Sequence, residues 1–148
     1  MKSLITTMMS LALCSTIFTF AVVASESGDM TTMKVQFQLK NTDVVIALDD
    51  HETNRNLLTL LPRKLDWEDY ASTEKISYLP RKLDIQGRPA GYKPARGDFA
   101  YYAPWGNIVI FCKDFSYSTG LIKLGHIESG LENACQTGEY SVVLQPAG

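Results

Sequence analysis

Histidine, cysteine and basic charge are all scarce in this chain of 148 residues. It has two histidines and three cysteines, and neither CxxC nor HExxH spacing occurs, so the sequence predicts no metal site. No motif indicates a cofactor, and we expect none. Lys and Arg together number 14 against 16 Asp and Glu, a formal net charge of -2. This charge has the wrong sign for a protein that follows phosphate backbones, so we expect no nucleic-acid partner.

Apolar residues are present in the amount that a packed core needs. The chain is 45% hydrophobic, 10% aromatic and 20% charged, a composition that excludes disordered and collagen-like proteins. The length favours a single domain. No linker divides the sequence into two parts.

Acidic residues are absent from the first 24 positions, which begin with one cation at Lys2 and continue as an apolar run. This pattern, with Val22 and Ala24 as small residues before the cut, is typical of a secretory signal peptide at residues 1–24. We expect cleavage after Ala24, a flexible mature N-terminus at residues 25–32 and a domain at residues 33–148. Because no second long apolar run follows, we expect no membrane span in the mature protein, which would be secreted or periplasmic.

Two cysteines, Cys112 and Cys135, follow the predicted signal peptide. In an oxidising compartment they could form one disulfide that closes a loop of about 20 residues and stabilises the fold by about 3 kcal/mol. The alternative is two separately buried small side chains. The sequence gives no Cα separation, so both interpretations stay open.

Short alternating apolar segments dominate the mature chain. Val35, Phe37 and Leu39 alternate with polar residues, which predicts a half-buried strand. Many short strands with few helices are typical of a closed barrel or a sandwich. Strands are predicted at residues 33–40, 44–48, 64–68, 75–79, 81–85, 98–103, 107–113, 121–127 and 140–144.

Two short helices and one long loop are expected between these strands. Asp49 has capping-box spacing to Glu52, and a leucine stripe follows that ends before Pro62. A second helix is predicted at residues 129–136 with Ser129 as its cap. Residues 86–97 contain several glycines and prolines and are predicted to be the longest irregular loop.

The hexapeptide LPRKLD occurs twice, at residues 61–66 and 79–84. Two copies at this spacing exclude a solenoid array. We expect each proline to open a strand whose leucines point inward and whose cations point outward. The alternative is that the four cations form an anion-binding strip.

Several motifs spread over residues 33–144 share their order and spacing with those of a known family. They are Leu60-Leu61-Pro62 with Leu65, Asp69-Tyr70 with Glu74-Lys75, Leu79-Pro80, Gly97-Asp98 before Tyr101-Tyr102, Pro104-Trp105-Gly106-Asn107, Ile110-Phe111-Cys112-Lys113, and Gly120-Leu121-Ile122 with Leu124-Gly125. Together they resemble the bacterial cyclophilin-like family, whose small domains share the cyclophilin barrel but are distant from true cyclophilins. The resemblance implies a mainly β fold, a closed antiparallel barrel of about eight strands with two short capping helices.

The resemblance implies less about activity, because a fold does not fix a function. True cyclophilins isomerise X-Pro bonds with an arginine offered to the peptide, and their mark is a Phe-His-Arg strand followed by Gln-Gly-Gly-Asp. Here His51 precedes Glu52 and His126 precedes Ile127, so neither histidine supplies that strand. We therefore assign no catalytic residue.

Aromatic residues gather around the long loop and the turn at residues 104–107. Tyrosine and tryptophan combine an apolar body with a polar tip, and many ligand pockets are built of them. We predict a ligand groove rimmed by Tyr102, Trp105 and Tyr117, with Arg96 or His126 as polar contacts. The alternative for each residue is packing in the core or in a turn.

Three functions are compatible with these observations. The first is a secreted or periplasmic module that binds a peptide or a small molecule without catalysis. The second is a divergent prolyl isomerase of exported proteins, which would need an arginine beside apolar residues in the groove. The third is docking of an envelope protein, which would need an exposed apolar patch away from the groove.

Overall fold

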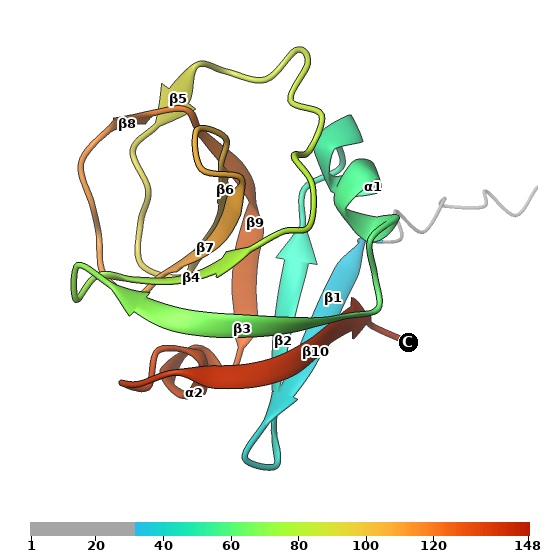
Figure 1. Cartoon of the computed structure of the whole chain (residues 1–148), viewed down its shortest axis with the longest axis vertical. Coiled ribbons are helices and arrows are strands. Elements are labelled where there is room, and N and C mark those ends of the chain that lie inside the picture. Colours follow the sequence, from blue (N-terminus) through green and yellow to red (C-terminus); the bar gives the residue numbers. More distant parts are fainter. Residues whose placement is uncertain (1–31) are drawn as a thin grey trace, which may run out of the picture. The chain divides into compact units, whose positions relative to one another are not determined.

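The structure, a computed structural model, describes residues 32–148, which contain the barrel of Figure 1. Eight strands close in the order β1-β10-β3-β4-β7-β6-β9-β2, and each neighbouring pair is antiparallel. The predicted closed antiparallel barrel is confirmed. The barrel strands are β1 Lys34–Leu39, β2 Thr42–Leu48, β3 Arg63–Tyr70, β4 Glu74–Tyr78, β6 Asp98–Tyr102, β7 Asn107–Phe111, β9 Leu121–Ser129 and β10 Tyr140–Pro146.

A short ribbon and two helices complete the part of the chain that the structure describes. The ribbon pairs β5 (Gly91–Tyr92) with β8 (Ser118–Thr119), so part of the predicted loop at residues 86–97 is a strand. No helix within residues 32–148 is long and apolar enough to cross a membrane. The predicted signal peptide lies outside the described residues.

Helix α1 (Glu52–Leu58) follows β2, and helix α2 (Leu131–Ala134) follows β9. Because these two neighbouring strands are antiparallel, the helices lie at opposite ends of the strand pair. The cap of α1 is His51, whose ring accepts a hydrogen bond from the Asn54 N–H at 3.3 Å, and not Asp49 as predicted. Helix α2 begins after Gly130, because Ser129 still belongs to β9. Both predicted helices are present, and both are shorter than the sequence pattern suggests.

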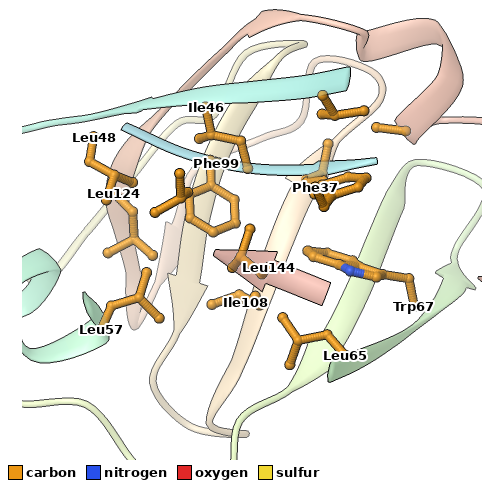
Figure 2. Packing of buried hydrophobic residues seen from close by; sticks show 14 of the residues in the cluster. Phe37, Ile46, Leu48, Leu57, Leu65, Trp67, Phe99, Ile108, Leu124 and Leu144 are labelled. Atoms are coloured by element: carbon orange, nitrogen blue, oxygen red, sulfur yellow. The ribbon is translucent and has the colours of Figure 1, made fainter. Parts of the chain in front are cut away.

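The core fills the inside of the barrel with alternate residues of its strands, as Figure 2 shows. Phe37 and Trp67 stack with their ring centroids 6.2 Å apart. Leu57 of α1 is fully buried among the strand residues and closes one end of the core. Because burial of each large apolar side chain contributes about 1.5–3 kcal/mol, this interior is the main source of stability.

A second apolar layer lies on the outer face of β4, β6, β7 and β9. Its members are the residues that alternate with the interior ones, and Tyr92 and Tyr102 pack against them. In β7 this leaves every residue buried, whichever face it occupies. The layer consists of Ile76, Ala100, Val109, Phe111 and Leu121.

The two LPRKLD copies have different structures. The first opens β3, with Leu65 buried, as expected. The predicted strand at residues 81–85 is wrong, because the second copy leaves the sheet and runs beside α1. Arg81 there donates hydrogen bonds to the side-chain oxygens of Asn56 at 3.0 Å and Thr59 at 2.9 Å. Its cation is therefore engaged with α1 rather than aligned with the first copy in an anion-binding strip.

Cys112 and Cys135 form a disulfide, with their Cα atoms 5.6 Å apart. The bridge ties the segment after β7 to the residue that ends α2. Of the two interpretations that the sequence leaves open, the structure therefore contains the cross-link.

Candidate functional site

A hollow of about 180 Å³ lies over the outer apolar layer, between the β3–β4 turn and the β6–β7 turn. Val109 and Leu121 belong to that layer and form part of its lining. Half of all the lining residues are aromatic, and a single one carries a carboxylate. The lining residues are Tyr70, Glu74, Tyr102, Trp105, Asn107, Val109, Phe111, Phe115, Ser118 and Leu121.

Trp105 projects from the tight β6–β7 turn, in which the Gly106 N–H donates to the Tyr102 carbonyl at 2.9 Å. Its indole meets the rings of Tyr70 and Tyr102 edge to face, with both centroid distances 5.4 Å. Such edge contacts add about 0.5–1.5 kcal/mol each beyond the apolar area that they bury. The indole nevertheless remains 46% exposed, so a large part of it is free for a ligand.

Three lining side chains from the neighbouring strands β3, β4 and β7 lie next to one another in the hollow. Glu74 at the start of β4 faces Tyr70 on β3 and Phe111 on β7 in register. Directly paired residues have Cβ atoms about 4.5–5.5 Å apart, so the Glu74 side chain is flanked by those of Tyr70 and Phe111. Phe111 in turn stacks on Phe115, with the centroids 6.5 Å apart.

Two polar side chains that line the hollow, those of Glu74 and Asn107, lack hydrogen-bond partners within residues 32–148. Burial raises the pKa of the Glu74 carboxyl above its usual value, and no cationic residue lines the hollow. Asn107 is 1% exposed, and its side-chain oxygen has no hydrogen-bond partner within residues 32–148. Both groups accept hydrogen bonds, and an unsatisfied buried acceptor costs about 1–3 kcal/mol.

The structure brings together two of the predicted groove residues, Tyr102 and Trp105. Tyr117 is 58% exposed and precedes Ser118, which lines the hollow, but Tyr117 itself does not line it. It lies at the rim.

Arg96 and His126 lie elsewhere. Arg96 lies in the turn before β6, whereas Tyr102 ends that strand, whose five residues span about 13 Å. The Arg96 guanidinium pairs with Glu132 beside a second, more polar hollow that the disulfide also lines. His126 faces Asp98 at the same end of the β6–β9 pair, five residues along β9 from Leu121. The groove expected from the sequence is therefore split between the two ends of one strand pair.

Several lining residues were not part of the predicted groove, above all Tyr70, Glu74, Asn107 and Phe111. One signal for them exists in the sequence. Residues 107–111 are apolar on both faces of a strand apart from Asn107, and an antiparallel strand with solvent on one side should instead alternate with polar residues.

Comparisons with known proteins agree on the fold. The profile of a family described as the cyclophilin-like family matches residues 37–145. Among solved structures, a hypothetical protein from Archaeoglobus fulgidus is similar, with a TM-score of 0.55 and 16% sequence identity over 78% of this chain and 95% of that chain. At this identity the likeness concerns the fold alone. No curated protein matches the chain.

Proposed function

The chain belongs to the cyclophilin-like family, and we propose that it is a secreted or periplasmic binding module that holds a peptide side chain or a small ligand without catalysing a reaction. The aromatic hollow carries this proposal. Tyr70, Trp105 and Phe115 are each more than 40% exposed and all border it. Exposed aromatic side chains gathered in one concave place are typical of a ligand site.

The size of the hollow narrows the ligand. Pockets for drug-sized molecules have volumes of about 300–1,000 Å³, and this one has about 180 Å³. It suits one side chain of a peptide or a small organic group. The rest of a bound peptide would lie over the rim near Tyr117.

The absence of arginine from the lining favours binding over isomerisation. A cyclophilin-type isomerase places an arginine beside an apolar groove, whereas the residues that line this hollow include none. Arg96, the nearest candidate in the sequence-based prediction, is engaged by Glu132 at the other hollow. Apart from the aromatic residues of the hollow and Tyr117, the large exposed apolar side chains of the described chain are Tyr78, Ile85 and Val143. They belong to three separate segments, so we do not favour an envelope-docking patch.

Two independent features support export. Residues 1–24 have the pattern of a signal peptide, and the mature chain carries a disulfide, which persists in oxidising compartments. Expression of the full chain in a bacterial host should release a product that begins at Ser25, as mass spectrometry of the secreted or periplasmic fraction would show. An unprocessed chain retained in the cytoplasm would contradict export.

Binding is tested with the processed protein and a panel of blocked tripeptides that differ at the central residue. We expect the panel to contain binders whose amide chemical-shift changes map to the hollow and disappear in Trp105→Ala. Tyr78→Ala is the matched control, since Tyr78 is also an exposed aromatic residue but does not line the hollow. Loss of binding in both variants, or in neither, would refute the assignment.

Catalysis is tested on the same protein in a protease-coupled assay with X-Pro peptides. Uncatalysed isomerisation takes tens to hundreds of seconds, so weak acceleration is detectable. We expect none. Acceleration that Arg96→Ala abolishes would instead establish a divergent isomerase.

A further inference from the structure

The hollow combines several aromatic faces, one carboxylate and one orphaned acceptor, and it has no cation of its own. Ring faces carry partial negative charge and attract cations. Glu74 forms no ion pair and no side-chain hydrogen bond that the structure shows within residues 32–148, although Arg96 and Lys113 border the adjoining hollow that it also lines. All these groups favour the same kind of occupant, one that is positively charged and donates hydrogen bonds.

We propose that the hollow, as the ligand site of the function proposed above, selects a primary ammonium group, with the lysine side chain of a peptide as its occupant. The alkyl part would lie against Phe111 and Trp105, and the ammonium group would lie beside Glu74. This inference depends on the proposed function and adds the chemical class of the ligand.

The carboxylate and the rings are placed to act together. Glu74 lies in register between Tyr70 and Phe111, so a cation at the carboxylate is also near their rings. Burial raises the pKa of Glu74, and a bound cation would offset this desolvation by stabilising the charged carboxylate. A neutral ligand would leave the carboxylate desolvated and uncompensated.

Glu74 distinguishes a primary ammonium from a quaternary one. Its half-buried carboxylate accepts hydrogen bonds, and a primary ammonium has three N–H donors. A trimethylated ammonium has none and would leave the carboxylate without a hydrogen bond.

The protein already holds one ammonium group in this manner on the other face of the same strand. Lys75 follows Glu74 in β4 and is 1% exposed. Its Nζ donates to the Asp69 carboxylate at 2.6 Å and to the Gly138 carbonyl at 2.6 Å, and lies 5.0 Å from the centroid of the Tyr140 ring. A carboxylate beside aromatic rings is also what the hollow offers at Glu74.

The test uses blocked Gly-X-Gly peptides in which X is lysine, norleucine or trimethyllysine, together with free butylamine, titrated calorimetrically into the processed protein. Norleucine has nearly the shape of lysine without the ammonium group. We expect the lysine peptide to bind about 10- to 100-fold more tightly than the norleucine peptide, the range for hydrogen bonds to charged groups. Butylamine that matches the lysine peptide would support the proposal and identify a free amine as the source of the ammonium group.

Four variants separate the contribution of the carboxylate from that of the aromatic residues. Glu74→Gln should reduce the affinity for the lysine peptide to that for norleucine, whereas Glu68→Gln, which removes an exposed carboxylate that does not line the hollow, should change it little. Trp105→Ala should abolish binding of both peptides. Phe115→Ala should do the same, because Phe115 lines the hollow from a different segment of the chain.

The outcomes distinguish this inference from the proposed function. Equal affinities for lysine and norleucine, or a lysine preference that survives Glu74→Gln, would overturn the inference and leave the proposed function standing if Trp105→Ala still abolishes binding. Preference for trimethyllysine would overturn the choice of a primary ammonium. No binding by any probe, or binding unaffected by Trp105→Ala and Phe115→Ala, would overturn both.

Discussion

Lys75 and Asp69 form an ion pair whose two charges have very different surroundings. The lysine side chain is 1% exposed and the aspartate side chain 41%. Asp69→Ala would leave the ammonium buried with only the Gly138 carbonyl as a polar partner, and loss of one partner from a buried pair costs about 3–5 kcal/mol. Lys75→Met would keep most of the buried volume and leave a carboxylate that water can reach. We therefore expect it to cost only about 1–2 kcal/mol, the scale of the lost hydrogen bonds.

A double variant that carries both substitutions tests the prediction more strictly. In the double variant no charge is buried, so it should be more stable than Asp69→Ala alone, and one substitution partly rescues the other. Urea unfolding followed by circular dichroism measures the four free energies. The exposed pair of Lys34 and Glu128, with its N–O distance of 2.8 Å, is the control. Each of its single substitutions should cost no more than about 1 kcal/mol. A double variant less stable than Asp69→Ala would refute the argument.

The same pair has a pH signature. The Lys75 hydrogen bond, followed by that from the Gly138 N–H, holds the pKa of the Asp69 carboxyl below its usual value. The contribution of the Asp69 carboxylate to the free energy of unfolding is therefore complete above the ordinary pKa of about 3.9. It is lost as the pH falls through the lower pKa of the folded protein. The stability difference between the native protein and Lys75→Met should narrow only in that acidic range.

Three further predictions concern other parts of the barrel. Replacing Cys112 and Cys135, which are separated by 23 positions, with serine should lower the free energy of unfolding by about 3 kcal/mol in urea titrations. Burial lowers the pKa of His51 below 6.5. The contribution of the neutral ring to the free energy of unfolding should therefore be complete above pH 6.5 and decline as the pH falls below it. His51→Asn, which keeps a capping acceptor, should flatten this decline in thermal melts at pH 5–7. Gly125→Ala would place a methyl carbon 1.9 Å from a β2 carbonyl oxygen and should lower the melting temperature more than Gly138→Ala, whose methyl group meets no atom within 4 Å.

Alternation along single strands could be predicted well, because it depends only on neighbouring residues. Val35, Phe37 and Leu39, whose alternation with polar residues predicts a half-buried strand, all point into the core. The position of the second LPRKLD copy could not be predicted, because its local pattern suits a strand. Its backbone instead gains a partner from another strand, since the Leu83 N–H donates to the Tyr101 hydroxyl at 3.1 Å. A tertiary contact of this kind overrides local propensity.

The candidate site required knowledge of register. Tyr70 and Trp105 are distant in sequence, and only the strand order β3-β4-β7-β6 brings their turns together. The sequence-based prediction placed His126 in the groove because it lacked the same information. His126 pairs with Asp98 at the start of β6, whereas Tyr102, which lines the hollow, ends β6 and pairs with Leu121.

The all-buried strand β7 explains why the hollow lies where it does. Its inner residues Ile108 and Ile110 belong to the core, and its outer residues Val109 and Phe111 are equally buried although no helix covers that face within the described chain. The outer residues are covered instead by Tyr102 at the end of β6, by Tyr92 of the short ribbon and by side chains from turns and loops such as Trp105 and Phe115. Turns cannot cover a sheet as evenly as a second layer does, so a gap remains between them. In an antiparallel barrel, a strand that is apolar on both faces therefore marks the side on which a ligand site can form.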